Sequence, residues 1–379
     1  MPQKAVKCAI YRGGTSRGIF FCKEDLPQDE QAMKNIFYQA IDVYNHSQID
    51  GLGAATSHTS KVVVVGKPTK AGADVNYTFY QMGIGQELAD ADGTCGNLMS
   101  AVGQFAINEG LVAVEAAETM KKIIIYDTNI DKLIEEYVPV LDGKAKTSGD
   151  YHMKGVIAPG AKICMDIIKP GGSKTGKSLP LGSLTTVQGQ GKAYQLSFVD
   201  IVNPLVLVDI RELGYQGNEA LNVLSEDQVF MEHIKYLRNQ AVVAVGWAEN
   251  NAKASQVSPI IPRLAVLAPP MDYISTSGQQ IKAQDVDIVG KLLSFNKMHR
   301  TFAASGLYCL AASCLLNGTV ANRLARRLDT SIEQCVRIGH PDGVVEVRVQ
   351  LDRAGDVLHV GMDRTARLIM RGEVFVAAH

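Results

Sequence analysis

Short apolar runs alternate with amphipathic segments along the first half of the chain. Residues 6–11 and 18–22 predict two strands around a glycine-rich turn (YRGGTSRG), and residues 61–65 (KVVVV) predict a buried strand. Helices are expected after Pro27 and after Gly96, because apolar residues recur there at helical spacing. These positions are Met33, Ile36, Phe37, Ala40 and Ile41 in the first helix and Leu98, Ala101, Val102 and Phe105 in the second.

The second half shows the same alternation after a segment rich in Gly, Pro and Lys (KPGGSKTGKSLPLGS, residues 169–183), which is the expected linker. Strands are expected at QLSFVDIV, NPLVLVD, AVVAVGW, RLAVLA and VVEVRVQL, and in the C-terminal stretch HVGMDRTARLIMRGEVFV. Ser225 and Gln228 form a capping box that predicts the start of a helix. Further helices are expected near 285–297 and after Ser305 and Gly306.

Two segments of the first half resemble segments of the second half, which suggests an internal duplication. SRGIFFCKEDL resembles NPLVLVDIREL, since each has a small polar start, an apolar strand and an acidic-Leu end. TCGNLMSAVGQFAINEGLV resembles ASGLYCLAASCLLNGTV, and this alignment sets Cys95 against Ser305 and Gly96 against Gly306. Internal repeats decide architecture, but this likeness is faint and the duplication is a hypothesis.

The composition is that of an ordinary globular protein, and 379 residues are enough for two domains. We expect these domains over residues 1–180 and 181–379. A net charge of −1 provides no basic field for nucleic acid, so an anionic substrate must be held by local groups. The seven cysteines follow no C-x-x-C pattern, and we find neither a signal peptide nor an apolar run of the ~18 residues that a membrane helix needs. We therefore expect a cytoplasmic protein that binds neither nucleic acid nor membranes.

The sharpest candidate for chemistry is DADGTCGN, residues 90–97, in which Cys95 stands directly before a predicted helix. The free N–H groups and the partial positive charge of a helix start stabilise a thiolate. Small neighbours such as Gly96 and Asn97 let a ligand approach the backbone closely. The alternative is a buried structural cysteine at a turn.

A second candidate is Lys61, which ends the segment TSHTSK and stands at the start of the apolar run VVVV. Removal of water from a lysine favours the neutral amine, which makes it a usable base. The alternative is a surface lysine that marks the beginning of a strand, since lysine is rarely buried.

Two loops could bind an anion. In GGTSRG, backbone N–H groups, hydroxyls and a guanidinium can hold a carboxylate, unless the segment is a plain hairpin turn. In GHPDG, His340 could face an anion, but the segment is as readily a turn. The histidines show no metal-binding spacing, so no metal site is expected. The candidates in the first loop are Gly14, Thr15, Ser16 and Arg17.

The segment GGSKTGKS, residues 171–178, matches the phosphate-loop pattern G-x-x-x-x-G-K-[ST] in full, and LSFVD could supply its acidic partner. That motif needs a helix that opens at the lysine. Leu-Pro-Leu-Gly follows at once instead, and proline and glycine both disfavour a continuing helix. We interpret the segment as part of the linker, with a nucleotide site as the alternative.

Several blocks together resemble one enzyme family, which contains 2-methylaconitate cis–trans isomerase, 3-methylitaconate Δ-isomerase and 4-oxalomesaconate tautomerase. The blocks are RGGTSRG, QIDGLGAATSHTSK, DGTCGN with the helix ending NEGLV, RIGHPDG, and RTARLIMRGEVFV. They cover nearly the whole chain and stand in the right order.

The resemblance implies the fold of diaminopimelate epimerase, an α/β (α+β) fold. Its two similar domains are each a curled, mostly antiparallel sheet around a central helix, and the active site lies in the cleft between them. The family needs no cofactor, and its acid/base pair, a lysine and a cysteine, matches Lys61 and Cys95. The second cysteine of the epimerase corresponds to Ser305, whereas Cys309 lies one turn later and is expected to face the core.

The expected reaction is a proton shift, as double-bond or cis–trans isomerisation, on a small unsaturated di- or tricarboxylic acid such as methylaconitate, methylitaconate or oxalomesaconate. Lys61 and Cys95 exchange the proton in an order that the sequence leaves open, while Ser16 and Ser60 orient carboxylates. The alternatives are an amino-acid racemase or epimerase on the same fold, and a non-catalytic carboxylate-binding protein. The expected partner is the small molecule, and a homo-oligomer stays open. Gly96, Asn97, Ser305, Gly306 and His340 complete the expected substrate-binding set.

Overall fold

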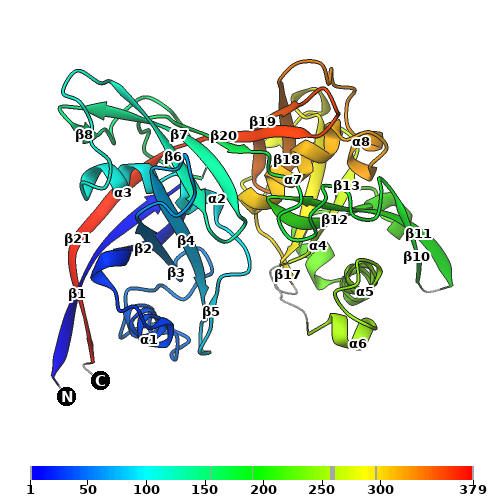
Figure 1. Ribbon diagram of the computed structural model, residues 1–379. Coiled ribbons are helices and arrows are strands. Elements are labelled where there is room, and N and C mark those ends of the chain that lie inside the picture. The colour runs from blue at the N-terminus through cyan, green and yellow to red at the C-terminus, as the bar shows by residue number, and fades with distance from the viewer. Residues whose placement is uncertain (1, 154, 190, 257–260, 295–296, 378–379) are drawn as a thin grey trace. The chain divides into compact units, whose positions relative to one another are not determined.

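The computed structural model describes residues 2–153, 155–189, 191–256, 261–294 and 297–377 (Figure 1). The chain divides into two compact units, one with the residues up to Asp166 and those from Asp363 onwards, the other with Ile167–Met362. Both units are mixed α/β and consist mainly of sheet, as the sequence predicts. No helix in the described ranges combines the length and apolar character needed to cross a membrane.

The division of the chain differs from the single boundary expected at residue 180. Strand β21 (Ala366–Ala377) pairs antiparallel with β1 (Gln3–Gly13) from one end to the other. The C-terminal residues therefore belong to the first unit, where β21 pairs with an edge of β1 that would otherwise be open. No local sequence pattern identifies this pairing. The location that the sequence predicts for the active site stays a prediction.

The first unit is a mixed sheet with helices on both faces. Antiparallel pairing joins β1 to β2, β3 to β4 and β6 to β7, and parallel pairing joins β2 to β3 and β4 to β6. Besides β1 and β21, its elements are β2 (Ser16–Cys22), η1 (Lys23–Asp25), α1 (Glu30–Ile41), β3 (Lys61–Gly66), β4 (Val75–Met82), β5 (Ala89–Asp90), α2 (Gly96–Met99), α3 (Val102–Asn108), β6 (Met120–Asp127), β7 (Lys132–Leu141), β8 (Lys144–Ala145) and β9 (Ile163–Ile168), which runs into the second unit.

Successive side chains of β2 face opposite sides of this sheet and mark its two cores. Phe21 stacks on Phe37 of α1, with ring centroids 5.5 Å apart. Phe20 contacts Phe105 of α3, with centroids 5.5 Å apart, and Tyr11 of β1 meets the same ring at 5.9 Å. Helix α1 therefore covers one face, and α3 covers the other.

The second unit has the same two-faced arrangement. Its elements are β10 (Thr185–Gly189), β11 (Lys192–Ile201), β12 (Asn203–Asp209), η2 (Ile210–Leu213), α4 (Leu221–Glu226), α5 (Gln228–Ala244), α6 (Asn251–Ala254), β13 (Arg263–Ala268), β14 (Tyr273–Ile274), β15 (Gln280–Ile281), η3 (Ala283–Asp285), β16 (Ile288–Ser294), β17 (Lys297–Met298), α7 (Ala304–Leu315), α8 (Val320–Leu324), β18 (Gln334–His340), β19 (Gly343–Leu351) and β20 (Val357–Arg364).

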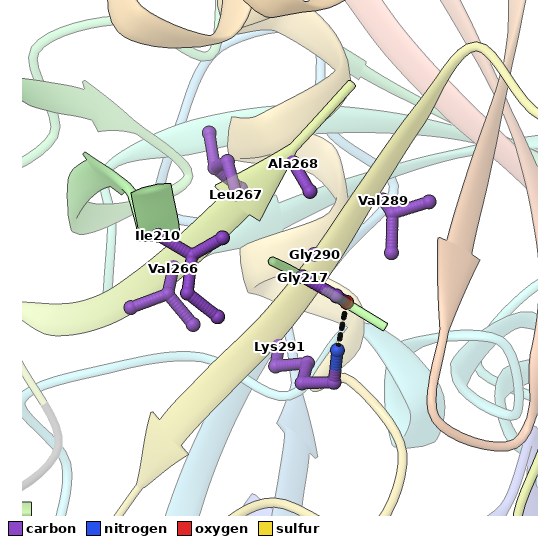
Figure 2. Close-up of a pocket in the computed structure, with 8 residues that line it drawn as sticks. All are labelled: Ile210, Gly217, Val266, Leu267, Ala268, Val289, Gly290 and Lys291. Atoms are coloured by element: carbon purple, nitrogen blue, oxygen red, sulfur yellow. Dashed lines mark hydrogen bonds between the residues drawn. The ribbon is translucent and has the colours of Figure 1, made fainter. Parts of the chain in front are cut away.

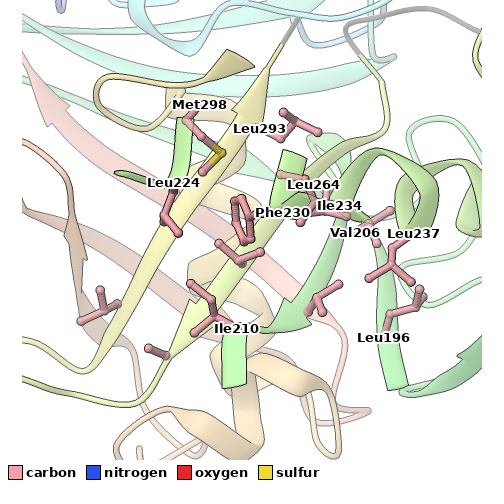
Figure 3. Packing of buried hydrophobic residues seen from close by; sticks show 14 of the residues in the cluster. Leu196, Val206, Ile210, Leu224, Phe230, Ile234, Leu237, Leu264, Leu293 and Met298 are labelled. Carbon is pink, nitrogen blue, oxygen red and sulfur yellow. The ribbon is translucent and has the colours of Figure 1, made fainter. Parts of the chain in front are cut away.

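Two helices cover the sheet of the second unit. Phe230, Ile234 and Leu237 of α5 pack with Val206 of β12 and Leu264 of β13, as Figure 3 shows. On the other face lies α7, every residue of which is buried. A helix that is apolar all round is expected only where protein surrounds it on all sides.

The order of elements in the first unit repeats in the second. The series β1-β2-α1-β3-β4-α2/α3-β6-β7 corresponds to β11-β12-α5-β13-β16-α7-β18-β19. The pairings also correspond: β12–β13 and β16–β18 are parallel, as are β2–β3 and β4–β6, and the flanking pairs are antiparallel in both units. The hypothesis of an internal duplication thus agrees with the topology.

Three local predictions for the second half were wrong. AVVAVGW is not a strand, because its first residues continue α5, where Ala241 and Val242 are buried at helical spacing after Leu237. The residues near 285–297 include strand β16 rather than a helix, since this segment pairs with β13 and β18. Asp227, not Ser225, caps α5 by accepting the N–H of Phe230.

Candidate functional site

The segment that carries Cys95 is held firmly to the sheet of the first unit. Thr94 donates its hydroxyl to the buried carboxylate of Asp127, which also accepts the N–H of Asn129 at 2.9 Å. The Asn129 amide in turn donates to the carbonyl oxygen of Ala91 at 2.9 Å. These contacts fix the part of the loop that directly precedes the candidate thiol.

Cys95 itself is half-buried and stands at the N-cap of α2. Its carbonyl oxygen accepts the hydroxyl of Tyr77 at 3.1 Å and the N–H of Met99 at 3.0 Å. The sequence predicts one long helix here, but the structure has the four-residue α2 and then α3 from Val102. A helix dipole grows with the number of aligned peptides, so the dipole of the four-residue α2 is small. What α2 provides to Cys95 is mainly its free N–H groups.

Lys61 is the first residue of β3 and is buried, with only 7% of its surface exposed. Its Nζ donates to Oε1 of Gln81 at 2.6 Å and lies 4.9 Å from the centre of the Phe79 ring. Burial, and secondarily the charge of Lys61, lowers the pKa of the nearby His58. The alternative of a surface lysine is therefore wrong.

The alternation of β3 puts Lys61 and Cys95 on the same side of the sheet. Lys61, Val63 and Val65 face one side and lie opposite Gln81, Phe79 and Tyr77 of β4 in the ladder. Val62 and Val64 belong instead to the cluster formed with α1. Because Tyr77 reaches the carbonyl of Cys95, the face that carries Lys61 is also the face on which the Cys95 loop lies.

The turn between β1 and β2 contacts the start of α2. Asn97 donates to Oγ1 of Thr15 at 3.0 Å and to Oγ of Ser16 at 3.5 Å. Gly14 has φ +52°, a conformation that residues with a Cβ rarely adopt, and a Cβ added there would lie 2.3 Å from Oδ1 of Asn97, so this position favours glycine. The turn that the sequence proposed for anion binding thus lies beside Cys95 and Gly96.

Arg17 and Ser60 point into the loop that precedes β3. The guanidinium of Arg17 donates to the carbonyl of Leu52 at 3.3 Å. The hydroxyl of Ser60 is fully buried and donates to Oε1 of Gln48 at 2.8 Å. Ser60 therefore fixes the loop in this structure, and its direct contact with a carboxylate stays a prediction.

Ser305 lies in the first turn of α7 and is buried. Its Oγ accepts from Nδ2 of Asn203 at 3.1 Å and from Nη1 of Arg263 at 3.1 Å. The neighbouring Gly306 faces the ring of Phe302, where a Cβ would lie 2.8 Å from the nearest ring carbon. Ser305 is thus part of a polar cluster, whereas Gly306 permits close packing.

Two other residues of the second unit are fixed by local contacts. His340 ends β18, and its Nδ1 accepts the N–H of Asp342 at 3.2 Å while its carbonyl accepts the hydroxyl of Tyr273. Cys309 is completely buried and its thiol donates to the carbonyl of Val199, so the expectation that it faces the core is confirmed. Burial raises the pKa of the Cys309 thiol far above its ordinary value, which makes it inert.

The phosphate-loop match folds around a carboxylate of its own chain. Asp200 is buried and accepts the N–H groups of Lys174 and Thr175 at 2.8 and 2.7 Å. It also accepts the hydroxyls of Ser173 and Thr175. The backbone donors that a phosphate would need are occupied, and no helix follows Lys177 before β10. The interpretation as a nucleotide site is therefore rejected.

A second buried lysine lies on the other face of its sheet. Lys291 of β16 donates to the carbonyl of Gly217 and lies beside Val289 and Ile210 in a shallow depression (Figure 2). Burial lowers its pKa to about 8. Val289 belongs to the α5 core, so Lys291 lies away from the α7 face that carries Ser305.

Several residues of these clusters escaped the sequence analysis. No sequence motif marks Gln81, Asn129 or Tyr77. Their contacts with the site follow only from the register of the strands. Arg263 could have been found, because it begins RLAVLA as Lys61 begins KVVVV. Within the described ranges, no group of three His, Cys, Asp or Glu side chains is placed to hold a metal ion.

Comparisons with known proteins cover almost the whole chain. The profile of the PrpF protein family matches residues 3–377. A 3-methylitaconate isomerase of Eubacterium barkeri is 37% identical over 99% of this chain and 98% of its own, and a 2-methyl-aconitate isomerase of Shewanella oneidensis is 32% identical over 99% and 98%.

Among solved structures, a methylitaconate-delta-isomerase superposes with a TM-score of 0.86 at 36% identity, over 99% of this chain and 96% of the other. The expected fold class and the expected enzyme class, an isomerase, are confirmed by these relatives. The family profile and these relatives match nearly the whole chain, including both units and all the sequence blocks named above. The chain therefore belongs to the PrpF protein family.

Proposed function

We propose that this chain is a cofactor-independent isomerase that shifts a proton on a small unsaturated di- or tricarboxylic acid. The observation that supports it most is the buried amine of Lys61, held by Gln81 on the same sheet face as the Cys95 loop. Burial removes hydration from the charged form of an amine, which makes a buried lysine a candidate base.

The chemistry balances with two groups. In the order that we favour, neutral Lys61 removes a proton from a carbon next to the conjugated double bond, and the electron pair spreads onto the conjugated carboxylate. The Cys95 thiol then delivers a proton to another carbon of the same system, which moves the double bond or allows rotation about it. Proton exchange with water restores both groups. Such acid–base help contributes roughly 10²–10⁴-fold.

Stabilising the carbanion is the other requirement, since a preorganised donor is worth roughly 3–4 kcal/mol at the developing charge. We assign this role to the polar groups of the turn and helix start next to Cys95, which are those of Gly14, Thr15, Ser16 and Asn97. Arg17 and Ser60 position the adjoining loop. We further propose that Ser305, Gly306 and His340 also contact the substrate.

Methylaconitate, methylitaconate and oxalomesaconate are the candidate substrates. Two relatives with full-length matches are named for the first two acids. These acids differ by a methyl or an oxo group, which a pocket distinguishes by only ~1–3 kcal/mol. We propose a cytoplasmic location as well, because the seven cysteines are odd in number and follow no C-x-x-C pattern, which fits a reducing compartment.

The test is proton NMR of the enzyme in heavy water with these acids and with a panel of amino acids. We expect deuterium to enter one of the unsaturated acids together with conversion to its isomer. Label at Cα of an amino acid instead would establish the racemase alternative. Binding of an acid with no exchange at any carbon would establish the non-catalytic alternative.

A further inference from the structure

Each proton-transfer residue of the first unit has an equivalent position in the second unit, because the order and pairing of the elements repeat. In the parallel pair β2–β3, Ile19 lies opposite Val62, which brings Gly18 opposite Lys61. In the parallel pair β12–β13, Leu205 lies opposite Arg263. Gly18 and Leu205 are each the third residue of their strand, so Lys61 and Arg263 occupy the same place in the repeat.

The neighbours of Arg263 follow the same correspondence. Ser16 and Asn203 are the first residues of β2 and β12, and Cys95 and Ser305 stand at the start of the helix that covers the equivalent sheet face. In the second unit these positions form one cluster, since the Ser305 hydroxyl accepts both the Asn203 amide and the Arg263 guanidinium at 3.1 Å.

The chemistry of the two clusters differs. An arginine stays protonated in proteins, and a serine hydroxyl and an amide do not titrate near neutral pH. The cluster of Arg263, Asn203 and Ser305 is therefore unsuited to moving a proton from carbon. It is suited to a carboxylate, which a guanidinium binds through charge-assisted hydrogen bonds.

The orientation of Ser305 also indicates a ligand. A hydroxyl has one hydrogen to donate and two lone pairs to accept with. Both contacts of Ser305 use it as the acceptor, its surface is 97% buried, and no residue in the described ranges accepts its hydrogen. A buried donor without an acceptor costs free energy, and a bound carboxylate would accept it.

We propose that Arg263, with Ser305 and Asn203, binds a carboxylate of the substrate and that this cluster takes no part in the proton transfer. The proposal rests on the proposed function and narrows it. The substrate must carry a carboxylate in addition to the one that conjugates with the migrating double bond, and both proton-transfer groups belong to the first unit.

The experiment compares Arg263→Ala, Arg263→Lys and Ser305→Ala with wild type in steady-state kinetics on the acid that the wild type converts. Arg211→Ala is the matched control, because Arg211 is an exposed arginine of the same unit that pairs with Asp209. Loss of a hydrogen-bonded charge predicts a rise in KM of roughly 10–150-fold for Arg263→Ala. We expect a smaller rise for Ser305→Ala, and partial rescue by Arg263→Lys or by added guanidinium ion.

The pH profile of kcat separates binding from proton transfer. It should stay unchanged in Arg263→Ala and Ser305→Ala, since neither variant removes a titrating group. An unchanged KM in a folded Arg263→Ala variant, or a displaced kcat profile, would overturn the proposal. Thermal unfolding establishes folding, and Arg263→Lys serves if the alanine variant does not fold.

The failure of the proposed function is a distinct outcome. If the wild type converts none of the acids, calorimetric titration with aconitate still tests the cluster. Aconitate binding that is lost in Arg263→Ala and kept in Arg211→Ala would support the carboxylate site even though the isomerase proposal had failed. Equal binding by both variants, or no binding by wild type, would contradict it.

Discussion

A buried acid on β7 makes the stability of the first unit dependent on pH. Glu136 is completely buried, and one of its carboxyl oxygens accepts the N–H of Gly103 at 2.8 Å. Its other oxygen is also buried and has no hydrogen-bond partner in the described ranges. Burial raises the pKa of Glu136 to about 8, against the weaker opposing effect of the Gly103 hydrogen bond.

The direction of the pH dependence follows from the protonation of Glu136 in the folded and unfolded states. The pKa is raised in the folded state, so between pH 4.5 and about pH 8 the unfolded chain ionises Glu136 while the folded chain keeps it protonated. The unfolded state then binds fewer protons, and the free energy of unfolding falls as the pH rises through this window. At about 1.36 kcal/mol per pH unit, the loss at pH 7 is about 3 kcal/mol.

Glu136→Gln removes the ionisation and keeps the acceptor for Gly103. We expect the variant to exceed wild type by about 3 kcal/mol at pH 7, while the difference disappears near pH 4.5. Urea unfolding at several pH values between 5 and 8 measures it. Glu135→Gln is the control, because Glu135 pairs with Lys122 near the surface and should show less than about 1 kcal/mol without this trend. A difference between Glu136→Gln and wild type that does not grow with pH would refute the reasoning.

Three further predictions concern the site and the loops around it. Gln81→Leu removes the acceptor of Lys61, so we expect kcat/KM to fall roughly tenfold or more with folding retained, as kinetics and circular dichroism can check. Gly14→Ala forces a Cβ against Asn97 and should reduce both thermal stability and turnover, whereas Gly72→Ala, also at positive φ but in open space, should cost only about 1–2 kcal/mol of stability and leave turnover unchanged. Lys177→Ala should leave ATP titrations as flat as those of wild type, and any ATP binding that this substitution abolishes would restore the phosphate-loop interpretation.

The sequence was informative where the chemistry and the local pattern coincide. The apolar run after Lys61 predicted a buried strand, and its register explains why the amine is held within the protein. The segment YRGGTSRG predicted a glycine-rich turn between two strands, and the structure has this turn between β1 and β2, where Gly14 has φ +52°. These features depend on neighbouring residues in the chain, which periodicity and turn chemistry describe well.

What escaped prediction depends on distant partners. Strand β16 was expected to be a helix, because a short apolar run fits both periods and only its ladders with β13 and β18 decide between them. The return of β21 to β1 and the contact of Gln81 with Lys61 are set by pairing over long sequence separations. Arg263 stands out as a site residue only when the two repeats are aligned, which places it at the position of Lys61.

The central claim is that Lys61 and Cys95 together move the proton. Its most direct test is the rate of deuterium incorporation from heavy water into the unsaturated acid by Lys61→Met and Cys95→Ser, with the exposed residues changed in Lys70→Met and Cys335→Ser as controls. We predict that both site variants still bind the acid but lose exchange by at least about 10²-fold, while both controls exchange at the wild-type rate. Exchange at the wild-type rate in either site variant would contradict the account.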